Sequence, residues 1–189
     1  MEKTLTFIVD TRNQKDAFVV DGLQQLGHKV LRSKLPFGDV ALSTNILNCI
    51  DLKSSGGGLI ELAKNRMSRD HDRMKREIVN CKEAGGKITF MCFEDGITCL
   101  DEIATKWQVP KFKSDLYEEY TDDAGNKHKR LVARRRGMPM WKGNPVSLMK
   151  SLKTMTEQDH YGEGFKVDLV FATKSNCARK IIKILTRED

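Results

Sequence analysis

The sequence predicts an α/β fold: a central mixed β-sheet flanked by helices, with a basic hairpin or loop inserted late in the chain. Three observations predict it. Short apolar runs alternate with helical stripes of apolar residues, which is typical of layered α/β folds. The run at residues 46–53 is apolar on both faces, which indicates an inner strand covered from each side. A polar, densely basic stretch at about 108–144 breaks the alternation.

The first half of the chain supplies most of the expected sheet. Its strands are short apolar runs, and the first of them ends in a carboxylate, Asp10. Its helices carry an apolar residue every three or four positions and end at glycine. We expect strands at residues 5–9, 29–31, 40–42, 46–53 and 87–93. We expect helices at residues 15–26, from residue 59 onward, and at about 68–84.

The second half begins with the insertion and then returns to the alternating pattern. Turn-forming residues between two polar runs favour a hairpin within 108–144. After it, Asn144 and Pro145 begin a helix, because Asn is a good N-cap and Pro suits the first helical position. A last strand at 167–171 and a closing helix over 178–185 complete the expected fold.

The overall charge points to nucleic acid as a partner. The 189 residues hold 33 Lys and Arg against 26 Asp and Glu, a net charge of +7. A basic surface attracts polyanions. The alternatives are a charge that serves solubility alone, or an anionic membrane surface, but no apolar run is long enough to span a bilayer.

The cysteines and histidines argue against a zinc site. There are five cysteines and four histidines, widely scattered, and no CxxC pair. This usage is typical of reduced thiols in a cytosolic protein, whether in a bacterial or phage-infected cell or in a nucleus.

Three aspartates and one lysine form the candidate active site. Asp10 ends a strand, Asp39 lies in a turn, and Asp51 and Lys53 project from the same face of the inner strand because they are two residues apart. A buried Asp and Lys are costly unless they are paired or bound to metal. Mg²⁺ prefers carboxylate oxygens, so the three aspartates are candidate metal ligands. Lys53 would orient a water or stabilise developing negative charge. The alternative is a purely structural ion pair.

Three motifs resemble a known family. VDTR at residues 9–12, LPFGDV at 35–40 and IDLKSS at 50–55 are similar, in order, to the VDxRE, GD and ERKS-like motifs in the nuclease domain of XPF-type structure-specific endonucleases. The resemblance implies a restriction-endonuclease-like PD-(D/E)xK core, dependence on Mg²⁺ or Mn²⁺, and cleavage of branched, flapped or partly single-stranded DNA in repair or recombination. It implies that residues 1–189 form a single nuclease domain with an insertion at about 108–144. The matching site residues are Asp10, Asp39, Asp51 and Lys53.

The sequence also departs from that pattern. Asn13 replaces the Glu of VDxRE, and the ERK triplet reads Asp51-Leu52-Lys53. An acid usually found soon after ERKS has no clear counterpart, Glu61 being the nearest. We expect neither the family's helicase domain nor its helix-hairpin-helix domains here, so DNA targeting is expected from this domain, a partner protein or a homodimer. Two alternatives stay open: a nuclease-like DNA-binding module that does not cut, and a junction-resolvase or restriction-type nuclease.

Arginines supply the expected contacts to DNA phosphates. Several recur at helical spacing after the active-site strand, and three more are consecutive in the insertion. The alternatives are a solvated helix face and a charged loop. The candidates are Arg12, Arg66, Arg69, Arg73, Arg134, Arg135 and Arg136.

Overall fold

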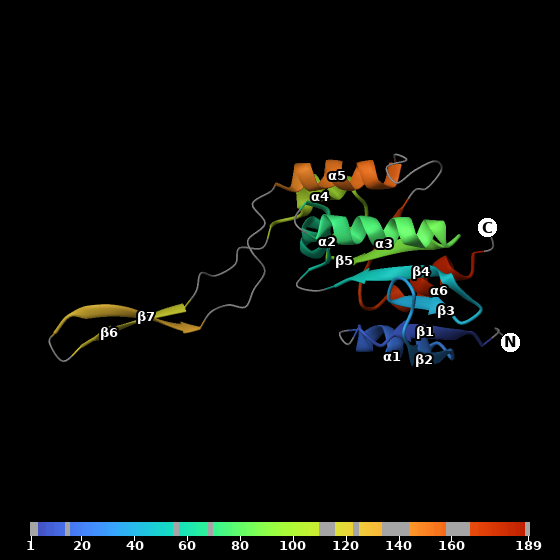
Figure 1. The fold of residues 1–189 in the computed structure, drawn as a ribbon, viewed down its shortest axis with the longest axis horizontal. Helices are drawn as coiled ribbons and strands as arrows, with labels where there is room; N and C mark the ends of the chain where they lie inside the picture. The colour runs from blue at the N-terminus through green and yellow to red at the C-terminus, as the bar shows by residue number, and fades with distance from the viewer. Residues whose placement is uncertain are drawn as a thin grey trace.

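A six-stranded mixed sheet forms the centre of the protein in a computed structural model (Figure 1). The structure describes residues 4–13, 16–54, 57–67, 70–109, 116–122, 125–133, 144–157 and 167–187. The strand order is β2-β1-β3-β4-β5-β8. The strands are β1 (Thr6–Asp10), β2 (Lys29–Ser33), β3 (Val40–Leu42), β4 (Asn45–Lys53), β5 (Lys87–Phe93) and β8 (Asp168–Ala172).

The sheet is mixed because its two halves pair differently. β1 runs parallel to β2 and antiparallel to β3, which in turn is antiparallel to β4. β4, β5 and β8 are parallel to one another. The expected fold class is therefore confirmed: a mixed sheet with helices on its faces, consistent with a restriction-endonuclease-like fold.

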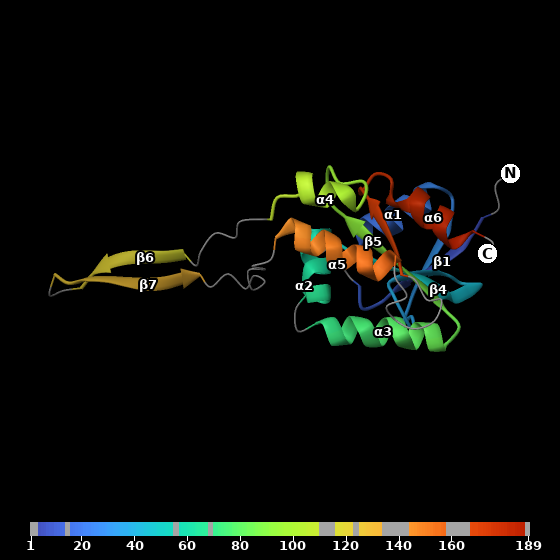
Figure 2. The ribbon, with the colours of Figure 1, turned by 90° about the horizontal axis from the view of Figure 1, so that it is seen from above.

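Helices cover both faces of the sheet and bury two apolar clusters (Figures 1 and 2). On one face lie α1 (Ala17–Gln25) and α6 (Cys177–Leu185). On the other lie α2 (Gly58–Met67), α3 (His71–Glu83), α4 (Asp101–Lys106) and α5 (Pro145–Glu157). The expected N-cap of α5 is confirmed, since Ser147 N donates to Asn144 Oδ1 at 2.8 Å. The sequence did not predict α4, because its six residues are too few to establish a helical period.

Strand β4 has the two-sided burial that the sequence predicted for an inner strand. Ile50 and Leu52 join the cluster beneath α1 and α6. Cys49 joins the cluster beneath α3. Asp51 and Lys53 follow Cys49 at alternate positions on the same side. The side chains of Asp51 and Lys53 therefore lie at the end of β4, on the face of the sheet that α3 covers.

The insertion contains an antiparallel hairpin, as the sequence predicted. β6 (Leu116–Thr121) and β7 (Lys127–Ala133) form a separate two-stranded sheet, which Figure 1 draws apart from the six-stranded sheet. The register sets Glu118 opposite Arg130 and Glu119 opposite Lys129. The two strands hold two acidic and three basic residues, so they carry one net positive charge. The arginines expected to bind DNA here, Arg134, Arg135 and Arg136, lie outside the described residues.

The structure contains neither a disulfide nor a membrane-spanning helix among the described residues. All five cysteines are free, and only Cys99 is exposed. Within the described parts of the chain, no helix combines the length and the apolar character needed to cross a bilayer.

Candidate active site

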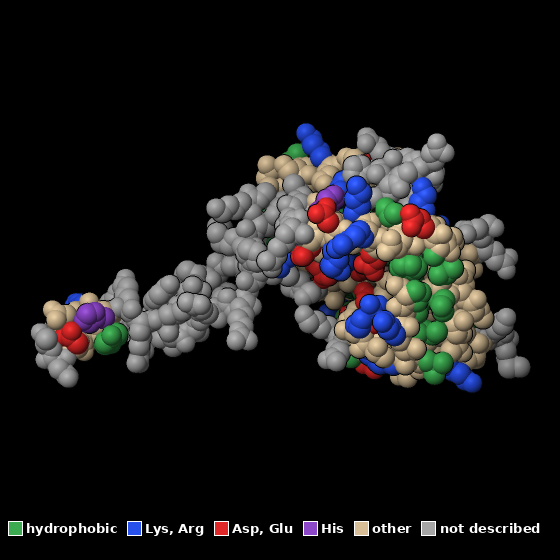
Figure 3. All heavy atoms as spheres, viewed as in Figure 1, with side chains coloured by type: hydrophobic (Ala, Val, Ile, Leu, Met, Phe, Trp, Pro, Cys, Tyr) green, Lys and Arg blue, Asp and Glu red, His purple; other side chains and the backbone are tan. Residues whose placement is uncertain are grey.

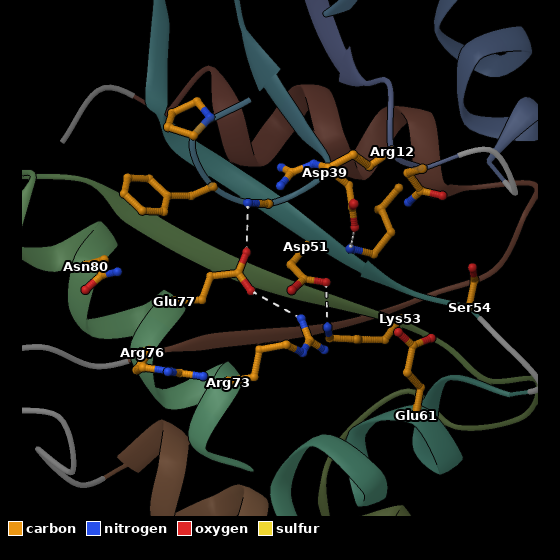
Figure 4. A pocket seen from close by; sticks show the side chains of 15 residues that line it. Arg12, Asp39, Asp51, Lys53, Ser54, Glu61, Arg73, Arg76, Glu77 and Asn80 are labelled. Atoms are coloured by element: carbon orange, nitrogen blue, oxygen red, sulfur yellow. Dashed lines mark hydrogen bonds and ion pairs between the residues drawn. The ribbon is translucent and has the colours of Figure 1, made fainter. Parts of the chain in front are cut away.

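An open pocket of about 860 Å³ lies where β4 ends, between α3 and the turn that precedes β3. Figure 3 shows acidic side chains in this hollow with Lys and Arg side chains on both sides, and Figure 4 shows its lining. We call it the acidic pocket. Its lining residues are Arg12, Asn13, Pro36, Phe37, Gly38, Asp39, Asp51, Leu52, Lys53, Ser54, Glu61, Arg73, Arg76, Glu77 and Asn80.

Asp39 is held in the pocket by a tight turn. Gly38 has φ +62°, and a Cβ there would lie 2.9 Å from the Ile50 carbonyl oxygen, so only glycine fits. Asp39 N donates to that same carbonyl at 2.8 Å. The Asp39 carboxylate accepts a hydrogen bond of 2.7 Å from Leu52 N. The turn therefore fixes the carboxylate against β4, next to Asp51.

The charge of Asp51 acts on the Asp39 carboxyl. Burial raises the pKa of Asp39 to about 7, and the nearby charge of Asp51 adds to the rise. Near neutral pH the Asp39 carboxyl therefore resists becoming charged beside Asp51. A divalent cation between them would remove this repulsion, and Mg²⁺ is commonly held by one or two protein carboxylates together with waters and phosphates. The donor set of the pocket thus fits such an ion.

Lys53 is a buried, charged amine. Its Nζ lies 2.6 Å from Asp51 Oδ1, and the residue is 4% exposed. Burial lowers the pKa of Lys53, but the facing charges of Asp51 and Glu61 outweigh that effect and raise it. The ammonium also lies 5.1 Å from the centre of the Phe90 ring. The pocket therefore holds a positive charge at a fixed position beside its carboxylates.

Glu61 is a further acidic residue of the pocket. In the sequence it was only the acid nearest to the position where the resembled family has one after its ERKS motif. It lies in the first turn of α2 and lines the pocket. The close approach of α2 to β4 brings it there. A Cβ on Gly58 would lie 2.5 Å from the Lys53 carbonyl oxygen and 2.7 Å from Phe93 N. The absence of a side chain at Gly58 thus allows this contact.

Asp10 does not line the pocket, although the sequence predicted it as a metal ligand together with Asp39 and Asp51. Its carboxylate accepts hydrogen bonds from Arg12 Nε at 2.8 Å, Arg12 Nη2 at 2.7 Å, Arg12 N at 2.7 Å and Leu35 N at 2.8 Å. Burial raises the pKa of Asp10, but these hydrogen bonds outweigh it and lower the pKa to about 2. Across the described ranges, no group of three Asp, Glu, His or Cys side chains is arranged to hold a metal ion. Asp10 instead orients Arg12.

Three arginines border the pocket. Arg12 also donates from Nη2 to the Leu35 carbonyl at 3.0 Å, which fixes it on the β1 side. Arg73 and Arg76 face it from α3. Of the other expected phosphate contacts, Arg66 lies beside His71 and does not line the pocket, and Arg69 lies outside the described residues.

Helix α3 brings to the pocket Arg73, which the sequence predicted to contact DNA, and three residues that the sequence did not place there. Arg73, Arg76, Glu77 and Asn80 all line the pocket. Their spacing of three, four and seven residues places them on one helical face. That spacing was visible in the sequence, but nothing there indicated that this face turns toward Asp39 and Asp51.

Asp16 is a second unexpected acid, buried behind the pocket. It is 0% exposed and precedes α1, yet its carboxylate does not cap the helix. Oδ1 accepts a long hydrogen bond of 3.4 Å from the pocket residue Ser54, and Oδ2 has no partner among the described residues. Burial raises the pKa of Asp16 to about 6.

Comparisons with known proteins support the fold. No family model matches the chain, and no curated protein matches it. The solved structure of XPF from Aeropyrum pernix is similar, with a TM-score of 0.54 at 16% sequence identity. The match covers 97% of this chain and 62% of that chain, so this protein corresponds to less than two thirds of its neighbour. The likeness shows the fold alone: the mixed sheet and its helices are arranged as in that structure.

Proposed function

We propose that this protein is a divalent-metal-dependent endonuclease that hydrolyses phosphodiester bonds in branched or flapped DNA. The observation that carries the proposal is the pairing of Asp39 and Asp51 beside the buried ammonium of Lys53, in an open pocket bordered by arginines. The XPF-like fold supports the nuclease class. The preference for branched DNA rests on the three sequence motifs.

Each pocket residue has a role in the proposed reaction. Asp39 and Asp51 would hold Mg²⁺ or Mn²⁺, which when bound lowers the pKa of a water and offsets charge on the phosphate. Lys53 stabilises the negative charge that develops on the phosphate oxygens, because its own charge is fixed before substrate binds. Arg12, oriented by Asp10, binds a neighbouring phosphate.

The arginines of α3 complete the proposed substrate surface. Arg73 and Arg76 lie on the opposite side of the carboxylates from Arg12. Arginines on both sides would attract the DNA backbone and align it over the carboxylates, since phosphate contacts set register and orientation. The net charge of +7 favours the same partner. Pairing of two copies into a homodimer is a separate proposal, which a mass measurement in solution tests.

One observation favours a second candidate function. Asn13 lines the pocket at the position where the resembled family has Glu. A lost acid can reduce or abolish catalysis while DNA binding survives. The second candidate is therefore a nuclease-like module that binds DNA without cutting it.

A cleavage assay separates these functions. Linear, flapped and four-way DNA are incubated with Mg²⁺ or Mn²⁺ and the wild type, Asp51→Asn or Lys53→Ala. We expect the wild type to cut flapped DNA, and each variant to lose about 100-fold or more in rate while still binding DNA. Asp168→Asn is the matched control, because Asp168 pairs with Lys87 and does not line the pocket.

The other possible outcomes of the cleavage assay favour different functions. Binding without cutting by the wild type favours the binding module. Preferred cutting of four-way or linear DNA favours a resolvase or restriction-type nuclease. Unchanged cutting by Asp51→Asn would contradict the assignment of the site.

A further inference from the structure

Glu77 is an acidic side chain placed among the arginines of the pocket. It lies on α3 and is 27% exposed. Its Oε1 accepts a hydrogen bond from Gly38 N at 3.3 Å, and its Oε2 lies 3.9 Å from Arg73 Nη1. Figure 4 shows the side chain reaching from α3 toward the turn, with the Arg73 guanidinium on its other side.

The contact with Gly38 matters because the next residue in the chain is Asp39. The positive φ of Gly38 excludes a side chain that could anchor the turn. Asp39 N is bonded to β4 through the Ile50 carbonyl at 2.8 Å. Glu77 supplies the bond on the α3 side. The turn that presents the Asp39 carboxylate is thus held from two directions.

Glu77 also acts on the arginines through its charge. The pKa of Arg12 is raised first by its hydrogen bond to Asp10, and further by the charges of Asp10 and Glu77. Arg73 is ion-paired to Glu77 across one helical turn. A negative charge at this point opposes the approach of a phosphate, so it is unfavourable for DNA binding. We therefore expect Glu77 to have a favourable role that offsets this cost to DNA binding.

We propose that Glu77 is a positioning residue that fixes the Gly38-Asp39 turn through the Gly38 N–H, at the expense of DNA affinity. This inference rests on the proposed nuclease function. It makes two predictions of opposite sign. Removing the acceptor lowers the cleavage rate because Asp39 is no longer held. Removing the charge strengthens DNA binding because the arginines are less neutralised.

Three substitutions of Glu77 separate the hydrogen bond from the charge. Glu77→Gln keeps an oxygen that accepts from Gly38 N and removes the charge. Glu77→Ala removes both, and Glu77→Met removes both while keeping side-chain bulk, should alanine destabilise α3. Glu83→Ala is the control, since Glu83 is an exposed acid on the same helix and does not line the pocket.

The expected results differ between the variants. Glu77→Gln keeps a kcat within about threefold of the wild type, whereas Glu77→Ala and Glu77→Met lose about tenfold or more, because small misplacements of catalytic groups are costly. All three bind DNA without metal about two- to fivefold more tightly, as for a weak ion pair. Glu83→Ala leaves kcat unchanged.

A metal-free readout tests the positioning directly. Hydrogen exchange of the Gly38 amide should be slow in the wild type and Glu77→Gln, and faster in Glu77→Ala. Unchanged exchange and cleavage in Glu77→Ala would overturn the inference. Equal loss of cleavage in Glu77→Gln and Glu77→Ala would also overturn it, because the charge would then matter rather than the acceptor. If the wild type does not cut DNA, the proposed function fails, while amide exchange and DNA affinity still decide the role of Glu77.

Discussion

Three aspartates that are buried or partly buried titrate differently because hydrogen-bond donors, and not burial alone, set the pKa of such a carboxyl. Asp10 accepts four hydrogen bonds, and its pKa falls to about 2. Asp16 accepts one long bond from Ser54, and its pKa rises to about 6. Asp39 accepts one from a backbone amide and faces Asp51, and its pKa rises to about 7. Asp10 is therefore held in its charged form by its hydrogen bonds, whereas Asp39 is the proposed metal ligand whose charged form is disfavoured near neutral pH.

Replacing Asp10 with Asn should destabilise the protein whether or not metal is present. The pKa of Asp10 is lowered, so its contribution to stability is present above about pH 4 and is lost as the pH falls through about 2. We expect Asp10→Asn to reduce the free energy of unfolding by about 1–3 kcal/mol at pH 7 and by less near pH 2. Denaturant unfolding with and without Mg²⁺ measures this. A deficit that appears only with Mg²⁺ would make Asp10 a metal ligand after all.

Replacing Asp16 with Asn should have the opposite effect. Because the pKa of Asp16 is raised, the charged form opposes folding, and stability is lost as the pH rises through about 6. Asn stays neutral, so Asp16→Asn should stabilise the protein at pH 7.5 by on the order of 1–2 kcal/mol and should have little effect near pH 4. Thermal unfolding at the two pH values measures the difference. Equal destabilisation at both would show that the burial of Asp16 is not what costs stability.

At the level of elements, the pocket depends on how closely α2 and α3 approach the sheet. Gly58 at the start of α2 leaves no room for a Cβ against β4 and β5. α3 turns one polar face toward the pocket while Met74, Ile78 and Cys81 anchor its other face in the core. Each helix thus has a buried contact that fixes the position of its pocket residues.

Adding a methyl group at Gly58 should therefore disturb the site and the fold together. The new Cβ would lie 2.5 Å from the Lys53 carbonyl oxygen and 2.6 Å from Cys92 Sγ. We expect Gly58→Ala to lower the free energy of unfolding by about 1–3 kcal/mol and to weaken cleavage, because α2 and Glu61 must shift. Gly125→Ala is the control. It has a positive φ but open space around it, so only the hairpin turn should be strained. Wild-type stability in Gly58→Ala would contradict this packing.

In the whole molecule, more than half of the net charge lies outside the sheet and its helices. Residues 110–143 hold nine Lys and Arg and five Asp and Glu, which is +4 of the net +7. The hairpin within this segment pairs only with itself in the two-stranded sheet. None of its side chains that the structure describes belongs to either apolar cluster. Under the proposed function, we expect the segment to contribute to DNA binding and not to the stability of the sheet.

Deleting residues 110–143 and joining the ends with a short Gly-Ser linker tests this separation. We expect the melting temperature to change by only a few degrees, because both apolar clusters remain. We expect DNA affinity to fall about tenfold or more at low salt, with a shallower salt dependence, because fewer phosphates are neutralised. Affinity measured over a salt series checks this. Loss of the folded state would show instead that the insertion stabilises the sheet.

The sequence alone determined the order and type of nearly every element, and it placed Asp39, Asp51 and Lys53 in one site. Those features are local. Apolar residues that repeat every two positions indicate a strand, and apolar residues that repeat every 3.6 positions indicate a helix. Residues two apart on a strand share a face. The glycine before Asp39 likewise indicated a turn, and Gly38 there has a positive φ. Helix α4 has only six residues, which are too few to show a helical repeat of apolar residues.

Only the tertiary structure decided which polar residues meet. It paired Asp10 with Arg12 and the Leu35 backbone, and so removed Asp10 from the acidic pocket. It brought Glu61 and Glu77 to the same pocket. The contact from Gly38 to Glu77 joins residues 39 positions apart. Such contacts depend on how helices pack across a sheet, and hydrophobic periodicity specifies the buried face of each helix but not which neighbour its polar face meets.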